Sequence, residues 1–522
     1  MKLFIVLLTG AFMLATGTSD VFAKKKEKVQ TEAKSDTVRT ASKKRNTQYP
    51  RLFKNKRVVT KKGLITIHKI DDKLYFEFPK SLLGREFLMG SSISATSDNT
   101  SGLVGQTMTT PLHIRFAIQE DQVYMQNVTP VSRMDVYSNQ SDISKAVAKS
   151  NITPDMESFK IAAYNMDSTA VVFEVTKFFL ADNKRLPLFD QNSSSLEDEK
   201  YGQLELKAVL KKNLSSIRNF YVFDDNLEIN LDMSFYQSLL ASKKEVRGGN
   251  VRVKAVYSML LLPEETMVWR LGDPRLGYTF TKKQKISTEK DGTAFSYLQH
   301  KWNLLPADEE AYRRGDLVAP RKPVVFYIDS DFPEAWKKAI KEGVNWWNEA
   351  FKMAGFKDAV QTADFPANDT TFYAGNLKYS CIRYVPVNLS KTQSKVWVDP
   401  RSGEIINGTI FVGHDIAKTI ASQRFVQTAQ VDERMRGIQL SEEVLLEGIR
   451  LYVAREVGHC LGLADNASAS AAFSVESLRS PEFTRQNGIA SSVMDELPYN
   501  YIAQPQDGKA DFIQNKLGAY DL

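Results

Sequence analysis

The sequence has little cysteine and, beyond its first residues, no long apolar run. Its two cysteines are Cys381 and Cys460, and neither has a second cysteine at CxxC spacing, which argues against a cysteine metal site. The two thiols could pair in an oxidising compartment, but the helical setting of Cys460 favours burial as a small apolar residue. No segment after residue 23 is long and apolar enough for a transmembrane helix.

Residues 1–23 have the pattern of a secretory signal. Lys2 supplies the positive start, and the apolar run from Leu3 to Leu14 is too short to span a bilayer comfortably. Val21-Phe22-Ala23 suits cleavage before Lys24. The pattern predicts an exported protein, in the periplasm, at the cell surface or outside the cell. An uncleaved anchor is the alternative.

Positive charge is concentrated in one segment. Residues 24–62 carry 11 Lys and 4 Arg against 3 acidic residues, so the net charge of +7 for the whole chain hides an acidic remainder. The segment is polar and lacks apolar periodicity, which predicts a basic disordered linker. It could contact polyanions such as lipid head groups, cell-wall polymers or nucleic acid, without recognising a specific nucleic acid. A solvated spacer is the alternative.

Alternating apolar and polar residues predict a β-rich region from residue 63 to about 305. Gly63 to Ile70 and Leu74 to Phe78 alternate on either side of a polar turn, which is typical of a hairpin. Further strands are expected in Ile114 to Ile118, Val171 to Val175, Val251 to Leu262 and Phe295 to Trp302. We divide this region into a small β unit at 63–110 and a β-rich domain at 111–305.

A charged, proline-bearing stretch at 306–323 marks a boundary, and residues 320–522 form the next expected domain. Strands and helices alternate in this part of the sequence. The expected elements are a strand at Pro323 to Ile328, a helix from Pro333 to Gly355, a strand at Leu377 to Val385, a strand after the turn at Pro400 to Gly403, and a helix between Ser441 and Gly462. This order fits the α/β core of a peptidase.

The last of these helices ends in the most informative motif, Arg455-Glu456-Val457-Gly458-His459-Cys460-Leu461-Gly462-Leu463-Ala464-Asp465. A zinc-peptidase helix places two histidines four residues apart on one face, with a glutamate beside the first as the general base. Glu456 and His459 occupy the positions of the base and the second ligand. Asp465 occupies the position of a third ligand, and Arg455 stands where the first histidine is required.

Arg455 changes the chemistry expected of this motif. A guanidinium is permanently protonated and offers a metal no lone pair, whereas a zinc hydrolase needs three protein ligands and one open position. With His459 and Asp465 alone, affinity for zinc should fall by orders of magnitude. The guanidinium could instead take the space of the cation and pair with Asp465 or Glu456. An ordinary buried helix is the structural alternative.

From about residue 63 to the end, the chain resembles the bacterial metzincin-type zinc metallopeptidases that carry β-rich N-terminal domains. The matching segments keep the same order and similar spacing. They are GLITIHKIDDKLYFEFPKSLLGREFL from Gly63, GDPRLGYTF from Gly272, PVVFYIDSDFPEAWKKAIKEGVNWWNEAFKMAGF from Pro323, VDPRSGEIINGTI from Val398, AREVGHCLGLADN from Ala454 and SSVMDELPYNYIAQP from Ser491. The resemblance implies an α+β fold, with a β-rich N-terminal region followed by a metzincin-like α/β zinc-peptidase domain.

The family motif HEVGHTLGLRHN places the first zinc ligand on Arg455 of this chain. The resemblance implies zinc as the cofactor, Glu456 as the catalytic base, and His459 and Asp465 as metal ligands. The substitution at Arg455 leaves that zinc site incomplete.

The resemblance extends to the methionine turn beneath the metal, which falls on Ser492 to Asp495. The tyrosine that the family usually has two residues after the methionine is Glu496 here. Relatives continue past this point with a largely helical region, which implies a shortened substrate cleft. The strand after Gly403 resembles the edge strand on which metzincins lay a peptide, so extended peptides could bind there by strand addition.

Three functional hypotheses follow. The first is a secreted metzincin-fold protein that is catalytically inactive or impaired, a pseudopeptidase that binds peptides or proteins. The second is an active zinc-dependent endopeptidase whose rearranged metal site uses His459, Asp465 and a further residue such as Glu456 or Glu496. His414, the other histidine of this region, is expected to be exposed. The third is an envelope interaction protein whose basic tail contacts polyanions.

Overall fold

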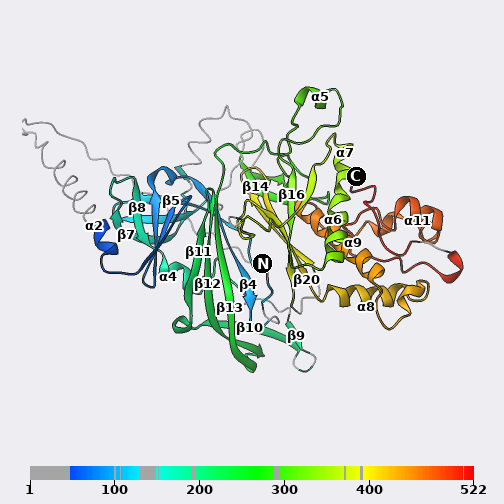
Figure 1. Cartoon of the computed structure of the whole chain (residues 1–522), viewed down its shortest axis with the longest axis horizontal. Coiled ribbons are helices and arrows are strands. Elements are labelled where there is room, and N and C mark those ends of the chain that lie inside the picture. The colour runs from blue at the N-terminus through cyan, green and yellow to red at the C-terminus, as the bar shows by residue number, and fades with distance from the viewer. Residues whose placement is uncertain are drawn as a thin grey trace, which may run out of the picture.

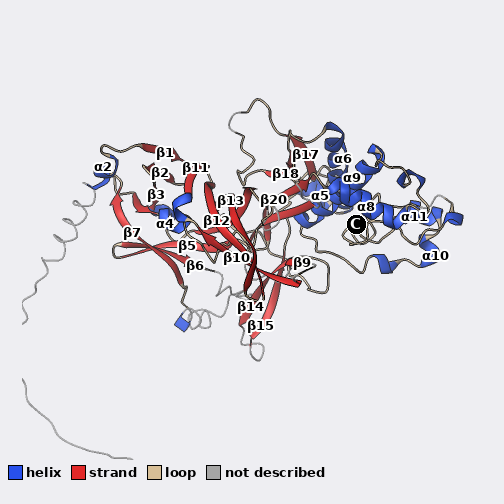
Figure 2. Ribbon diagram, turned by 90° about the horizontal axis from the view of Figure 1, so that it is seen from below, coloured by secondary structure: helices blue, strands red, loops and turns tan. Residues whose placement is uncertain are grey.

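The computed structural model describes residues 48–522, with gaps at 99–101, 106, 129–148, 151, 190–195, 199, 201, 287–292, 370–371, 388–391 and 509–510. Strands dominate the first part of the described chain, and helices gather in its second part (Figures 1 and 2). The predicted signal at 1–23 and most of the basic segment lie outside the described residues.

The N-terminal part is built on one antiparallel sheet of 13 strands. These strands are β1 (Val58–Lys62), β2 (Thr66–Ile70), β3 (Lys73–Pro79), β4 (Glu86–Thr96), β5 (Leu112–Gln119), β6 (Gln122–Asn127), β7 (Asp155–Tyr164), β8 (Ala170–Glu174), β9 (Leu196–Asp198), β10 (Gly202–Leu210), β11 (Ser216–Val222), β12 (Asn226–Ala241) and β13 (Lys244–Leu261). Their order is β1-β2-β3-β8-β7-β6-β5-β4-β13-β12-β10-β9, and β11 pairs with β12. The predicted hairpin, β2 with β3, is confirmed.

The sheet curls around its own core. Phe78 on β3 and Phe116 on β5 have ring centroids 4.9 Å apart, although β8, β7 and β6 separate their strands in the sheet. At the other side, Lys69 on β2 donates a hydrogen bond to the carbonyl of Ile217 on β11 at 2.6 Å. The apolar members of the alternating pattern, such as Phe76 on β3, point into this core because burial of apolar surface drives the folding of a half-buried strand.

The expected disordered linker ends earlier than residue 62. Residues 48–53 form helix α2 (Gln48–Phe53), and β1 pairs with β2 along its whole length. Phe53 and Val58 pack against a small cluster around Ile70 and Tyr75. The basic composition predicted disorder for this segment. Its order depends instead on the few apolar residues between the basic ones, which pack against the sheet.

Strands on either side of residue 110 are hydrogen-bonded to each other, since β4 pairs with β5. The hydrogen-bonded sheet is therefore continuous across the expected boundary between units 63–110 and 111–305. That boundary stays a prediction. A short helix, α4 (Thr176–Phe179), and a separate hairpin, β14 (Phe280–Ile286) with β15 (Thr293–Gln299), complete this region before helix α5 (Glu309–Arg313).

The C-terminal part is built on a five-stranded sheet of order β17-β16-β18-β20-β19. Its strands are β16 (Val324–Ile328), β17 (Val360–Asp364), β18 (Ser380–Val385), β19 (Thr392–Asp399) and β20 (Glu404–Gly413). Only β19 runs antiparallel, as the partner of β20 in a hairpin. Helices α6 (Glu334–Asn345), α7 (Trp347–Met353) and α9 (Glu442–Leu461) bury one face of this sheet.

The long helix predicted after Pro333 is two successive helical segments, α6 and α7, which meet at Trp346. Gly355 ends them with φ +88°. The indole of Trp347 donates a hydrogen bond at 2.8 Å to the carbonyl of Ala454 in α9, which ties the two helical layers together. Helices α8 (Ile416–Thr428), α10 (Val475–Leu478) and α11 (Pro481–Asn487) lie at the far end (Figure 1).

Both cysteines are buried free thiols. Burial raises the pKa of the Cys381 thiol to about 12, which leaves it unreactive near neutral pH. Burial also raises the pKa of the Cys460 thiol well above its usual range. Within the described part of the chain, no helix combines the length and apolarity needed to cross a membrane.

Candidate active site

Helix α9 presents the motif, and its two ends explain why it does so. Ser441 caps the N-terminus by accepting a hydrogen bond from the backbone of Val444. Gly462 ends the helix in the left-handed region, with φ +103°. A side chain there would also collide with the carbonyl of His300. The chain therefore leaves the helix just after His459 and returns Asp465 toward it.

Arg455 and Asp465 form a short ion pair at the C-terminal end of α9. Nη2 of Arg455 lies 2.5 Å from Oδ1 of Asp465. Of the two partners left open by the sequence, Asp465 and Glu456, the structure selects Asp465. The pair is partly solvated, because the Asp465 side chain is 52% exposed.

His459 completes the same cluster. Its Nδ1 lies 3.0 Å from the carbonyl oxygen of Leu463. A carbonyl only accepts, so this nitrogen carries a proton and Nε2 faces Asp465. The distance from Nε2 to Oδ1 of Asp465 is 3.3 Å. One carboxylate oxygen therefore receives both Arg455 and, when it is protonated, His459.

Glu456 is separate from this cluster. It is buried, and its Oε1 accepts a hydrogen bond at 2.9 Å from the hydroxyl of Thr392, the first residue of β19. The contact orients the carboxylate between the helix and the edge of the sheet. Nothing in the sequence marked Thr392, because the two residues are 64 positions apart.

The methionine turn underlies the helix as expected. Met494 is fully buried. Gly458 is required here, since a side chain would collide with the sulfur of Met494 and approach the ring of Trp347. The turn is held from the end of the chain by Asp521, which accepts hydrogen bonds at 2.6 Å from the Ser492 hydroxyl and at 2.8 Å from the Val493 backbone.

A cavity of about 250 Å³ lies beside Arg455, between α9 and the segment that follows the methionine turn. Tyr452 from α9 and Glu496 from that segment both line it. Glu496 is exposed. The position that usually holds a tyrosine thus places a carboxylate at the rim of a pocket.

The residues present do not fit a zinc ion. Zinc requires lone-pair donors at roughly 2.0–2.2 Å, normally three from the protein in a hydrolase. Arg455 has none to offer, and it bonds to the carboxylate that would be a ligand. Over the described ranges, no group of three or more His, Cys, Asp or Glu side chains is placed to hold a metal.

The strand at the edge of the sheet beside the site is β19. The prediction that the strand after Gly403 is this edge strand is wrong. That strand is β20, which pairs with β18 on one side and β19 on the other. Both arms of the hairpin look alike in sequence. Which arm joins the parallel sheet depends on contacts with β18, and these are tertiary.

Neither of the other histidines of this half joins the cluster of Arg455, His459 and Asp465 among the described contacts. His414 is exposed, and its Nδ1 lies 2.6 Å from the hydroxyl of Tyr384. His300 sits behind the end of α9, with its ring nitrogens 3.0 Å from the hydroxyl of Thr279 and 2.9 Å from that of Thr281. Burial lowers the pKa of His300 to about 4.

Comparison with known families supports a metzincin-like C-terminal region. Residues 437–522 match the family described as Met-zincin, and the motif, ion pair and methionine turn all fall within this range. Residues 105–307 and 47–96 match two families described as domains of unknown function, DUF5117 and DUF5118. No curated protein and no solved structure matches the chain.

Proposed function

We propose that this chain is an exported pseudopeptidase, in which an arginine–aspartate ion pair takes the place of the zinc ion of a metzincin-like domain. It hydrolyses peptides poorly or not at all, and it binds them instead. The observation that carries the proposal is the 2.5 Å contact between Arg455 and Asp465. A guanidinium there supplies positive charge without an open coordination position for water.

Glu456 and His459 keep the motif positions of the general base and of a metal ligand, but both roles require a bound metal. A carboxylate base acts on water whose pKa a metal has lowered. Here Glu456 bonds to Thr392 and His459 to the backbone of Leu463. We assign both residues to holding the edge strand and the loop after α9 in place.

Peptide binding rests on two features next to the ion pair. Strand β19 lies at the edge of the five-stranded sheet, and an extended peptide can add to such an edge through backbone hydrogen bonds. The cavity beside Arg455 can receive a side chain of that peptide, and it offers Arg455 and Glu496 as charged contacts.

The test measures metal and proteolysis in the purified protein. After incubation with zinc, we expect the protein to retain much less than one zinc ion per chain. We also expect no chelator-sensitive cleavage of unfolded protein substrates. An array of extended peptides should still be bound. Stoichiometric zinc with chelator-sensitive cleavage would contradict the proposal.

The same experiment decides the alternative, an active endopeptidase with a rearranged metal site. That reading requires cleavage by the natural chain and its loss in His459→Ala. A matched control is His414→Ala, which removes an exposed histidine away from the motif.

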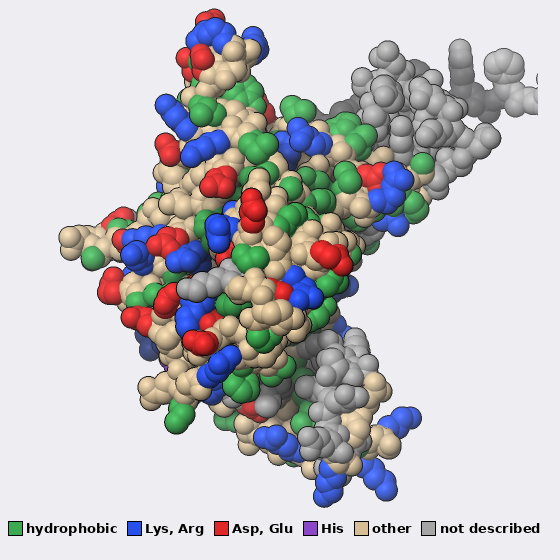
Figure 3. All heavy atoms as spheres, turned by 90° about the vertical axis from the view of Figure 1, so that its right-hand side faces the viewer, with side chains coloured by type: hydrophobic (Ala, Val, Ile, Leu, Met, Phe, Trp, Pro, Cys, Tyr) green, Lys and Arg blue, Asp and Glu red, His purple; other side chains and the backbone are tan. Residues whose placement is uncertain are grey.

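A contribution of residues 24–62 to polyanion binding stays a prediction. Most of that segment lies outside the described residues. Figure 3 shows acidic and basic side chains interspersed over one end of the molecule, with no large patch of a single sign among the described residues of that face. Such a face gives a polyanion no extended basic surface.

A further inference from the structure

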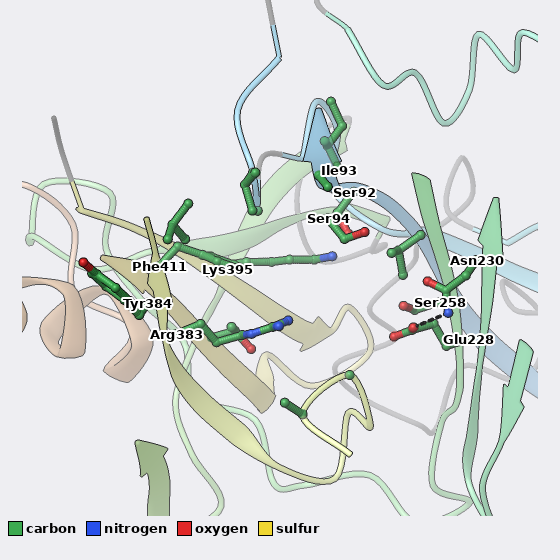
Figure 4. Close-up of a pocket in the computed structure, with 18 of the residues that line it drawn as sticks. Ser92, Ile93, Ser94, Glu228, Asn230, Ser258, Arg383, Tyr384, Lys395 and Phe411 are labelled. Carbon is green, nitrogen blue, oxygen red and sulfur yellow. Dashed lines mark hydrogen bonds between the residues drawn. The ribbon is translucent and has the colours of Figure 1, made fainter. Parts of the chain in front are cut away.

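A cavity of about 320 Å³ lies between the two sheets. It is on the face of the five-stranded C-terminal sheet opposite α9. Its walls come from β4, β12 and β13 of the N-terminal sheet and from β18, β19 and β20 of the C-terminal sheet (Figure 4). Trp397 closes one end by packing where Gly90 has no side chain. The size suits a small organic molecule.

Two cations extend into this cavity from the peptidase sheet. Arg383 on β18 and Lys395 on β19 both point toward the wall that carries Ser94 and Glu228 (Figure 4). In the described structure the side chain of Arg383 has no hydrogen bond or ion pair. Lys395 has only a cation–π contact, with its Nζ 5.1 Å from the centre of the Trp397 ring.

The facing carboxyl group, Glu228, is engaged by neutral hydrogen-bond donors. Oε1 of Glu228 accepts hydrogen bonds at 2.5 Å from Tyr373 and at 2.8 Å from Asn230. Burial raises the pKa of Glu228, which favours its neutral form. Neither cation forms an ion pair with Glu228 among the contacts of the described residues.

Strand pairing aligns the polar groups on that wall. Glu228 pairs with Ser258, and Asn230 with Val256, which itself pairs with Ser92. Paired residues point to the same face of a sheet. The hydroxyls of Ser258 and Ser92 therefore line the cavity beside Glu228 and face the two cations.

We propose that this cavity binds a small organic anion, whose carboxylate or phosphate group lies between Arg383 and Lys395 and whose polar end meets the hydroxyls opposite. A guanidinium holds a planar or tetrahedral oxyanion through paired hydrogen bonds, and an ammonium adds a point charge. Two partly desolvated cations without a counter-ion repel each other. A bound anion removes that repulsion. Anion binding in this cavity does not depend on the residues of the zinc motif.

The charge of Lys395 gives the site a pH dependence. Lys395 is only half-buried by surface, but dense protein around its amine lowers its pKa to about 8. The groups facing it are Arg383, Glu228 and Tyr373, and burial raises the pKa of Tyr373 above its usual range. As pH rises through about 8, Lys395 loses its charge and any ionisation of Glu228 adds repulsion. Anion affinity should therefore fall between pH 7 and 9.

The test titrates the full chain with succinate and, separately, with inorganic phosphate by calorimetry, at constant ionic strength set by sodium chloride. We expect saturable binding of at least one probe, with a dissociation constant below about 1 mM. Which probe binds distinguishes a carboxylate from a phosphate ligand. Arg383→Met and Lys395→Met should each weaken binding at least about tenfold, as loss of a charge-assisted hydrogen bond does.

Lys418→Met is the matched control, because Lys418 pairs with Asp415 on the surface and its side chain is 76% exposed. It should bind like the natural chain. No binding of either probe by the natural chain overturns the proposal, whether or not the variants fold. Binding that is equal in the control and in folded Arg383→Met, or that does not weaken toward pH 9, also overturns it.

Discussion

Arg455 occupies a motif position at which it can form an ion pair but cannot bind a metal. A guanidinium can replace the charge of a metal ion, but it has no vacant position at which water is activated. Its partner Asp465 is half exposed, and pairs of this kind contribute at most about 1 kcal/mol to stability. The pair therefore adds little to the stability of the fold, and its proposed importance lies in the metal ion that it replaces.

At this scale we predict that Arg455→His restores metal binding. The substitution supplies the missing ligand and releases Asp465, so three donors meet at one position. Zinc affinity should rise about 100-fold or more, measured by competition with a chromophoric chelator.

Arg450→His is the control for that experiment. Arg450 lies on the same helix, but its Nε donates to Glu342 at 2.7 Å. A histidine there should leave zinc affinity unchanged. An equal gain in both variants, or none in Arg455→His, would show that the cluster is not a displaced metal site.

Helix α9 is held at its C-terminus by a segment far away in sequence. The backbone and hydroxyl of Thr279 both donate to the carbonyl of Gly462, at 2.8 Å and 3.1 Å. His300 orients the hydroxyl of Thr279 through its own ring nitrogen. The element that presents the motif thus depends on a histidine that has no place in the motif.

This arrangement predicts a pH dependence of stability. His300 has a folded pKa of about 4 against an unfolded value of 6.5, so the unfolded chain binds more protons between these values. The contribution is present above pH 6.5 and is lost as pH falls toward 4, by at most about 3 kcal/mol. Urea unfolding at pH 7 and 4.5 measures it.

His300→Gln should flatten this part of the profile, because a glutamine can bond to the same hydroxyls without titrating. His414→Gln serves as the control, since His414 is exposed. A profile that is just as steep in His300→Gln would assign the acid sensitivity to other groups.

Across the whole molecule, the two sheets are joined by buried polar contacts. The side chain of Asn226 at the start of β12 donates to that of Asn376, before β18, at 2.8 Å. Tyr373 from the same loop bonds to Glu228 and stacks on Tyr221, with ring centroids 4.2 Å apart. These contacts help to hold the sheets face to face around the cavity with the two cations.

We therefore predict that Asn226→Ala destabilises the protein by about 1–3 kcal/mol, because it removes one of the two donors to the buried Asn376 side-chain oxygen and the acceptor of the Leu377 backbone N–H. Denaturant unfolding followed by tryptophan fluorescence measures the loss. In the double variant Asn226→Ala/Asn376→Ala, the loss of unfolding free energy should be smaller than the sum of the losses in the two single variants, because both substitutions remove the same contact. Asn515→Ala, at an exposed site, is the control and should have little effect; an equal loss there would refute a special role for the contact.

Local patterns predicted the elements with the clearest signals, but they missed others such as β12 and α8. The hairpin of β2 and β3, the strand β16, and both ends of α9 follow from alternation, from a serine cap and from a terminal glycine. The docking of β1 was missed because its apolar residues are few among lysines. The edge strand was misassigned because both arms of the β19–β20 hairpin have strand patterns.

For the site, the helical spacing was enough to predict that Arg455 and His459 share one face. It could not choose between Asp465 and Glu456 as the partner of Arg455. Thr392 and Asp521, which hold Glu456 and the methionine turn, escaped notice because they are distant in sequence and have no motif of their own.

The sequence by itself determined the type of those elements that have clear local signals, the position of the motif and the absence of a histidine at its first ligand position. These depend on neighbouring residues, through periodicity, caps and lone pairs. Only the tertiary structure decided that Arg455 pairs with Asp465, that β19 is the edge, and that Arg383, Lys395 and Glu228 surround one cavity. Such choices depend on which distant surfaces meet, because burial and hydrogen bonding are satisfied by whatever the fold brings together.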